Sequence, residues 1–250
     1  MAHLSSTRLG ARFPARLCAL ALCLLLCAAW PGKAAAAGDK AAHAGAHAAE
    51  GPAPDASARP AGGDKVQLFG TVEFKRPLTS LPAWLDLLQR NLRSPIFQPE
   101  KVFKRGVTWQ QFKAGAPKGG LELLRYVNSF WNAWPYKEDM ANWGKNDYWA
   151  IPAEFLKKSG DCEDYSIIKY FTLKELGVPA DTMRIVVVRD TIRNFAHAVL
   201  AVYMNGDAYI LDNLSAAVLS HGRLRQYMPQ YSVNESSRWA HLKGRKLPAR

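Results

Sequence analysis

Cysteine is scarce in this chain. There are four cysteines in 250 residues, and Cys18, Cys23 and Cys27 all lie in the apolar run from Leu17 to Ala29. That run follows several arginines and is too short to span a bilayer, which takes about 20 apolar residues. A basic segment, a short apolar segment and then small residues are typical of a cleavable secretory signal peptide. Residues 1–37 are therefore predicted to be removed on export, which leaves Cys162 alone and excludes an internal disulfide.

A lipid anchor on Cys27 is the alternative, but Leu26 stands where lipoprotein signals usually carry a small residue. The paired arginines of a twin-arginine signal are also absent, so export of the unfolded chain is expected. The mature protein is predicted to have no stable membrane insertion.

Large apolar side chains are almost missing from residues 38–64, which are rich in Ala, Gly and Pro. Such a segment cannot bury enough surface to offset its ordering entropy, so a disordered tether is predicted. Residues 65–250 then suit one ordinary domain. The chain carries a formal net charge of +12, but it has no arginine-rich helix and no run of stacked aromatics. Anionic envelope surfaces or acidic partners fit this pattern better than nucleic acid, but a solvated basic surface without a partner explains it best.

The order of periodic segments predicts an α+β fold, with a helical lobe first and an antiparallel sheet after it. Helices are expected after Pro82, around Trp109 and from Gly120, followed by an aromatic, turn-broken segment at 142–156. A further helix is expected over 162–176, with Asp161 as its N-cap. Three β-rich runs follow at 183–189, 196–204 and 208–212, and the sheet is expected to pack against the 162–176 helix.

Asn205-Gly206 between the last two runs is a strong signal for a two-residue hairpin turn. In that register Met204 faces Asp207, and His197 and Asp212 become diagonal neighbours on one face of the sheet. Their backbones would be about 7–8 Å apart, within reach of long side chains.

Cys162 would lie in the first turn of its helix, where backbone N–H groups and the helix dipole favour a thiolate. With His197 and Asp212 nearby, it could form a nucleophile, base and orienting acid. Three flanking carboxylates, Asp161, Glu163 and Asp164, oppose thiolate formation. Three interpretations remain open: the thiol is inert, the acids merely cap the helix, or a hard cation such as Ca²⁺ or Mg²⁺ neutralises them.

Several segments of the chain together resemble the bacterial transglutaminase-like cysteine proteases of the LapG type. The most specific of them are Gly160-Asp161-Cys162-Glu163-Asp164-Tyr165, His197-Ala198-Val199-Leu200 and Leu211-Asp212-Asn213-Leu214, and the resemblance extends over about residues 75–245.

The resemblance implies a papain-like, transglutaminase-type fold and calcium-dependent proteolysis in the periplasm. It makes Cys162 the nucleophile, His197 the base and Asp212 the orienting residue. It also makes Asp161, Glu163 and Asp164 calcium ligands. The implied substrate is the N-terminal retention region of a large surface adhesin, which is cut near an Ala-Ala pair to disperse biofilm. The implied regulator is an inner-membrane receptor for cyclic di-GMP that sequesters the protease.

Two other functions remain compatible with the sequence. The same triad could transfer the acyl group to an amine, as a transglutaminase-type cross-linker does. Alternatively, the chain could be a non-catalytic calcium-binding adaptor for the receptor, although an adaptor has no reason to retain all three triad residues.

Overall fold

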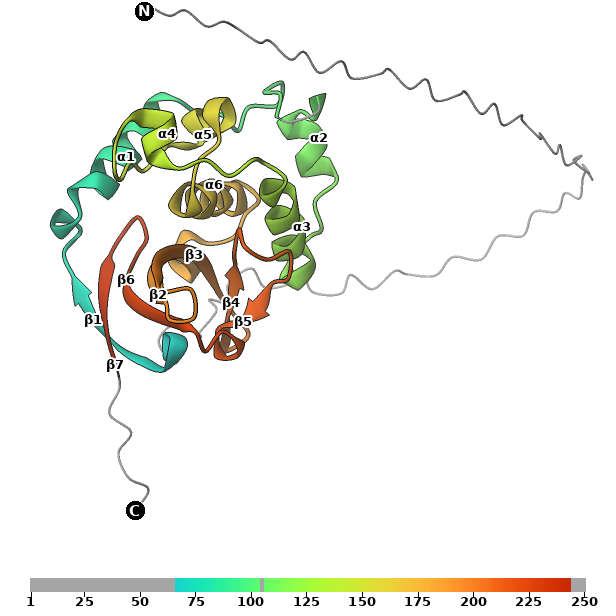
Figure 1. Ribbon diagram of the computed structural model, residues 1–250. Helices are drawn as coiled ribbons and strands as arrows, with labels where there is room; N and C mark the ends of the chain where they lie inside the picture. The colour runs from blue at the N-terminus through green and yellow to red at the C-terminus, as the bar shows by residue number, and fades with distance from the viewer. Residues whose placement is uncertain (1–65, 104–105, 244–250) are drawn as a thin grey trace, which may run out of the picture. The chain divides into compact units, whose positions relative to one another are not determined.

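A computed structural model describes residues 66–103 and 106–243 of the chain (Figure 1). The predicted signal peptide, the tether and the cysteines within them lie outside the described residues, so their boundaries stay predictions. Among the described helices, none is long and apolar enough to cross a membrane.

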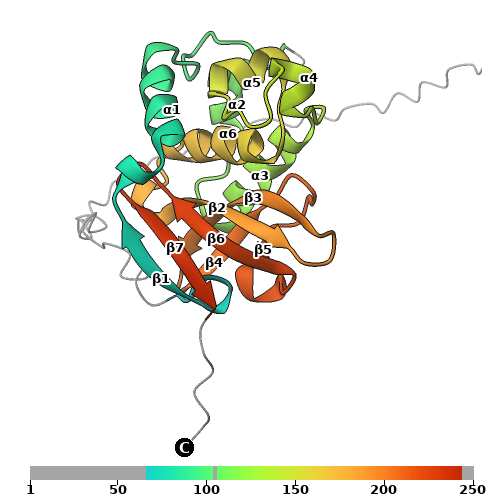
Figure 2. The same ribbon diagram turned by 60° about the vertical axis from the view of Figure 1, so that its left-hand side comes forward.

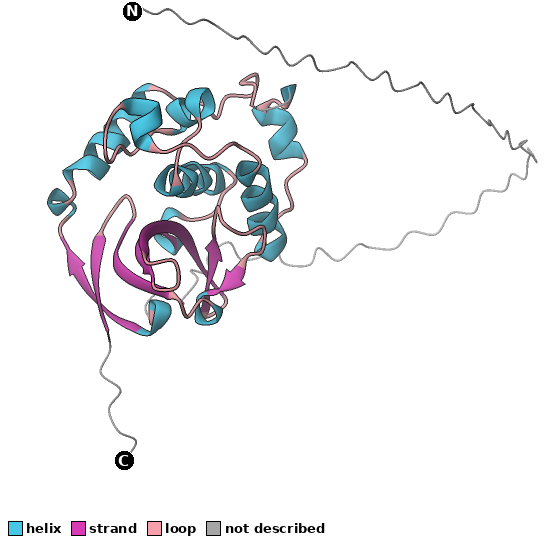
Figure 3. Cartoon of the chain, viewed as in Figure 1, coloured by secondary structure: helices cyan, strands magenta, loops and turns pink. Residues whose placement is uncertain are grey.

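Apart from one early strand, helices occupy the first half of the described chain and strands the second, as predicted. The helices and the strands lie in separate regions of the molecule (Figure 3). The α-helices are α1 (Pro82–Arg93), α2 (Trp109–Ala114), α3 (Gly120–Asn132), α4 (Asp139–Trp143), α5 (Pro152–Lys158) and α6 (Cys162–Glu175). The strands are β1 (Thr71–Arg76), β2 (Met183–Asp190), β3 (Phe195–Met204), β4 (Asp207–Leu211), β5 (Leu219–Ser220), β6 (Tyr227–Val233) and β7 (Arg238–Lys243). Short 3₁₀ helices are η1 (Leu68–Gly70), η2 (Leu78–Ser80), η4 (Ala180–Thr182) and η5 (His221–Arg223).

The strands form one antiparallel sheet in the order β1-β7-β6-β2-β3-β4-β5. Strand β1 was not anticipated, because the sequence analysis started the domain with a helix. It pairs with β7, a partner some 170 positions along the chain, for example Thr71 with Lys243. A pairing of that separation leaves no local signal in the sequence.

Helix α6 lies between the sheet and the remaining helices (Figures 1 and 2). Every residue of α6 from Asp164 to Leu173 is buried. A helix that is buried all round belongs in the middle of a core. Because its position is fixed from all sides, its N-terminus is a rigid place for a reactive side chain.

The sheet has a buried core on each face. Alternate residues of β2 and β3 such as Ile185 and Leu200 join the helical core, whereas Val186 and Val199 belong to a second cluster on the opposite face. The β3–β4 hairpin has the predicted register, with Met204 opposite Asp207. Its turn residues Asn205 and Gly206 have φ values of 55° and 76°, the left-handed conformation that a type I′ turn needs.

Candidate active site

Cys162 is the first residue of α6 and Asp161 is its N-cap, as the sequence predicted. The turn before the helix is held by Asp164, whose Oδ1 accepts from the Ala150 N–H at 2.7 Å and whose Oδ2 faces the Asp161 N–H at 3.4 Å. Position 160 must be glycine for this carboxylate to fit, because a Cβ on Gly160 would lie 2.0 Å from Asp164 Oδ2. Asp164 therefore fixes the backbone on which the cysteine is presented.

His197 and Asp212 meet as the hairpin register predicts, with His197 Nε2 2.9 Å from Asp212 Oδ1. Both side chains are buried. The Leu214 N–H also donates to Oδ1 at 2.9 Å, and the Tyr227 hydroxyl donates to Oδ2 at 2.5 Å. Burial alone would raise the pKa of Asp212, but these hydrogen bonds hold it below its usual value. An ionised Asp212 that accepts a hydrogen bond from the Nε2–H of His197 leaves Nδ1 unprotonated and able to act as a base.

Cys162 and His197 line one cleft of about 300 Å³, so the structure brings the predicted nucleophile and base together. The other lining residues are Asn146, Asp147, Trp149, Glu163, Val187, Ala196, Ala198 and Tyr231. A cleft that contains a thiol and an imidazole backed by a carboxylate can carry out acyl transfer.

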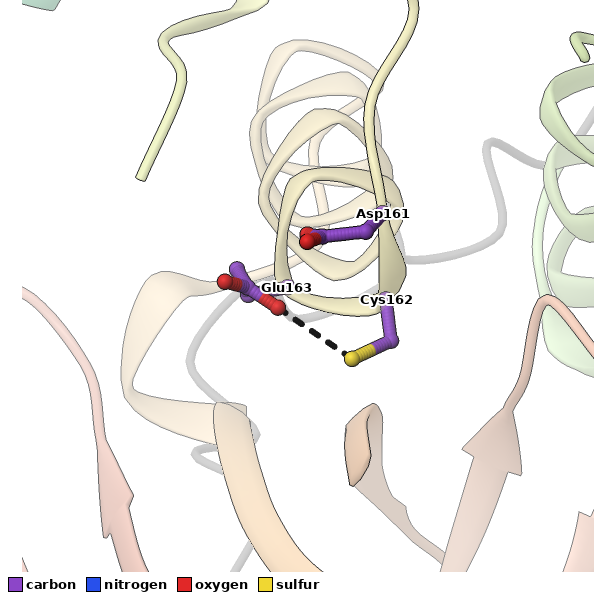
Figure 4. A group of neighbouring side chains, drawn as sticks. All are labelled: Asp161, Cys162 and Glu163. Atoms are coloured by element: carbon purple, nitrogen blue, oxygen red, sulfur yellow. Dashed lines mark hydrogen bonds between the residues drawn. The ribbon is translucent and has the colours of Figure 1, made fainter. Parts of the chain in front are cut away.

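The cysteine in this cleft is held as a thiol by its neighbours (Figure 4). The Cys162 thiol donates a hydrogen bond to Glu163 Oε2, and Sγ lies 3.2 Å from that oxygen. Burial raises the pKa of Cys162 well above its usual range, and the charges of Glu163 and Asp161 raise it further. The backbone of Ala198 acts in the opposite direction by hydrogen-bonding to the sulfur. The structure therefore contains the opposition expected from the sequence, in which the start of the helix favours a thiolate and the flanking carboxylates oppose it.

The carboxylates beside the cysteine form a larger cluster than the sequence analysis named. Asp139, Asp147 and Glu163 have oxygens within 4.8 Å of one another, and so do Asp139, Asp161 and Asp164. Burial and the charge of Asp161 raise the pKa of Asp139 to about 6. Burial and the charge of Glu163 raise the pKa of Asp161 to about 8.

Two oxygens of this cluster, Asp139 Oδ1 and Asp161 Oδ1, are buried without a hydrogen-bond partner among the described residues. Buried carboxylate oxygens that repel one another and are otherwise unsatisfied fit a hard divalent cation such as Ca²⁺. Glu163 thus shares one group with Asp139 and Asp147, while Asp161 and Asp164 share another with Asp139, so Asp139 links the predicted ligands.

Three residues of the site were missed by the sequence analysis. Asp139 is the first residue of α4 and Asp147 lies in the loop that follows α4, and the fold brings both beside the Asp-Cys-Glu-Asp segment at the start of α6. Tyr227 lies at the start of β6, for which no strand was predicted. Each of the three depends on a long-range contact, which no local pattern in the sequence reports.

Residues 107–247, more than half of the chain, match the family described as bacterial transglutaminase-like cysteine proteinase BTLCP. The chain belongs to this family. A comparison with curated proteins finds no match.

Solved structures similar to this cysteine proteinase include three of LapG from Legionella pneumophila. The calcium-bound LapG is 32% identical, with a TM-score of 0.50, over 62% of this chain and 86% of LapG. A second LapG structure is 37% identical over 53% of this chain and 75% of LapG, and an EGTA-treated one is 37% identical over 53% and 73%, both with a TM-score of 0.48. The fold predicted from the sequence is confirmed by the family match and by the observed sheet and helix α6.

Proposed function

We propose that the proteinase is a calcium-dependent cysteine endopeptidase in which Cys162 is the nucleophile, His197 the base and Asp212 the residue that orients it. The observation that carries this proposal is the shared cleft. Cys162 and His197 line the same space, and His197 is held from behind by Asp212 at 2.9 Å. Family membership supports the hydrolytic chemistry.

In the proposed reaction, His197 Nδ1 takes the Cys162 proton as the sulfur attacks the scissile carbonyl carbon. The imidazolium then returns that proton to the leaving amine when the C–N bond breaks, which leaves a thioester on Cys162. Water next attacks the thioester with His197 as the base, and the carboxylic acid product leaves as the thiol re-forms. Asp212 stabilises the imidazolium at both stages.

Calcium would be held by Asp161, Glu163 and Asp164, with Asp139 and Asp147 completing the set. When bound, it supplies a positive charge that offsets the acidic groups now opposing the thiolate. Glu163 has particular weight in this proposal, because it both belongs to the cluster and accepts the hydrogen bond of the Cys162 thiol. Drawing that carboxylate to a cation would release the thiol toward His197.

For the biological role, we propose a periplasmic protease that cleaves the N-terminal retention region of a large surface adhesin near an Ala-Ala pair. Cleavage would release the adhesin and promote biofilm dispersal. An inner-membrane cyclic di-GMP receptor would control access through its periplasmic domain. The similarity to LapG and the signal-like residues 1–37 support this assignment.

The first experiment is incubation of the mature protein with the N-terminal region of a large repeat adhesin encoded by the same organism, with Ca²⁺ or with a calcium chelator. We expect two smaller products with Ca²⁺, none with chelator, and recovery when Ca²⁺ is restored. Higher-mass species would instead identify a cross-linking acyl transferase. Cleavage unchanged by chelator would contradict the calcium dependence, and no processing in any condition would favour the adaptor function.

A further inference from the structure

The floor of the active-site cleft is the helix-facing side of the sheet. Ala198 on β3 pairs with Val187 on β2, and Val187 pairs with Tyr231 on β6. All three residues line the cleft together with Cys162. Since paired residues project from the same face of a sheet, they form one row of side chains beneath the scissile bond.

A second row with the same orientation continues this floor away from the helices. Two positions along β3 and β2, Ala196 pairs with Arg189, and Arg189 pairs with Met228, which lies three positions along β6. The β-bulge between Val187 and Val188 keeps Arg189 and Met228 paired despite the shift in β6. Ala196 itself lines the cleft, so the two rows are continuous.

Unlike the first row, the second row is open to solvent. Ala196 and Arg189 are exposed, and Met228 is 42% exposed. In Figure 2 the β2–β3 turn beside them lies at the side of the sheet, below the helices. An extended chain that enters the cleft from this side would therefore cross an uncovered strip with an apolar side chain and a cation.

The side chain of Arg189 contacts an amide and no carboxylate among residues 66–103 and 106–243. Its guanidinium donates to the side-chain carbonyl of Asn194. The neighbouring carboxylate of Asp190 accepts instead from the Ile192 and Arg193 N–H groups and pairs with the Arg193 guanidinium at 3.3 Å. Within the described residues, Arg189 has no ion-pair partner.

The spacing of the two rows gives the distance between Arg189 and the active site. Two residues along a strand span about 6.6 Å, and adjacent strands lie about 4.8 Å apart. The backbone of Arg189 is therefore about 8 Å from that of Ala198, which contacts the Cys162 sulfur. Since an extended substrate advances about 3.3 Å per residue, Arg189 meets a side chain roughly two to four residues from the scissile bond.

We propose that Ala196, Arg189 and Met228 form a specificity surface that docks the flanking segment of an extended polypeptide substrate carrying an acidic residue at that distance. This inference rests on the proposed endopeptidase function and deepens it. The carboxylate of the substrate pairs with Arg189, while its neighbouring apolar atoms cover Met228. The small side chain of Ala196 leaves room for the substrate backbone to continue to Cys162.

The test is a proteome-derived peptide library digested by the full mature protein with Ca²⁺, with the cleavage products sequenced by mass spectrometry. The wild type is expected to enrich Asp and Glu about fivefold at one position two to four residues from the cleaved bond, on one side only. Arg189→Glu should reverse this preference to Lys and Arg at the same position. Added salt should weaken both preferences, because exposed charges are screened.

Arg93→Glu is the matched control, since Arg93 is an exposed arginine in the last turn of α1 that does not line the cleft. It should leave the cleavage profile unchanged. Cys162-dependent cleavage with no acidic preference, or an identical profile for Arg189→Glu, would overturn the specificity surface alone. Absence of any cleavage that depends on Cys162 would overturn the endopeptidase function itself.

Discussion

The Asp212 side chain forms hydrogen bonds through both of its carboxylate oxygens. One oxygen accepts from His197 and Leu214, and the other accepts from the Tyr227 hydroxyl. A carboxylate fixed at both oxygens cannot rotate, so its orientation toward the imidazole is set before any substrate arrives. The Tyr227 ring also lies 5.7 Å from the His197 ring, centroid to centroid, which limits the movement of the imidazole.

Removal of the hydrogen bond between the Tyr227 hydroxyl and Asp212 should therefore affect catalysis more than folding. We expect Tyr227→Phe to lower kcat about tenfold, because a hydrogen bond to a charged group contributes about 1.5–3 kcal/mol. KM should change little, since Tyr227 does not line the cleft. The pH profile of kcat should also shift, as Asp212 holds the imidazolium less firmly. Steady-state kinetics on a cleaved peptide measures all three.

Tyr203→Phe is the control for that variant. Tyr203 is also a buried tyrosine and belongs to the same core cluster as Tyr227, but its hydroxyl has no hydrogen-bond partner among the described residues. Its loss should leave kcat and the pH profile unchanged. Equal effects of the two substitutions would mean that Tyr227 acts only through packing.

At the scale of the element, α6 carries the nucleophile at one end and a buried charge in its middle. Lys169 is fully buried two turns after Cys162, and burial lowers the pKa of Lys169 from 10.5 to about 7. Asp212 is the charge that opposes this shift. Between pH 7 and 10.5 the unfolded chain binds more protons at this lysine than the folded chain does. The free energy of unfolding should therefore rise with pH across this window.

Lys169→Met should remove this dependence. We expect the variant to be more stable than the wild type at pH 7, by on the order of 3 kcal/mol, because the cost of burying the charge disappears. The difference should shrink toward pH 10, where the wild-type lysine is neutral when folded. Urea unfolding at several pH values provides the measurement, and Lys174→Met, an exposed lysine on the same helix paired with Glu235, is the control. A difference in stability between Lys169→Met and the wild type that does not vary with pH would contradict the lowered pKa of Lys169.

Elements specified by neighbouring residues were predictable from the sequence. The start of α6 follows from Asp161 before an apolar run, and the His197–Asp212 contact follows from the Asn205-Gly206 turn, because a two-residue turn fixes the register. Strand β1 and the side chains of Asp139 and Asp147 were not predictable in this way. Their positions depend on β7 and on the packing of α4 and α5, which are specified by the whole core.

At the scale of the whole molecule, the sequence has a formal net charge of +12, whereas carboxylates gather at the active site. The carboxylates around Asp161 and Glu163 form an acidic cluster in an otherwise basic chain. This cluster lies beside Cys162, where a bound cation would offset the negative charge that opposes the thiolate. A basic surface would in turn attract acidic polypeptides, which agrees with the unpaired Arg189 beside the cleft. Both features fit a calcium-dependent enzyme acting on a protein substrate.

The central claim is that Cys162 performs the hydrolysis, and the most direct measurement compares wild type with Cys162→Ala at saturating Ca²⁺. The substrate is the N-terminal adhesin region, and intact-mass spectrometry identifies the products. Near-ultraviolet circular dichroism checks that the variant is folded. We expect the wild type to give two fragments whose masses sum to that of the substrate plus one water, and a folded Cys162→Ala to give none. Cleavage at the same bond by Cys162→Ala would contradict the account.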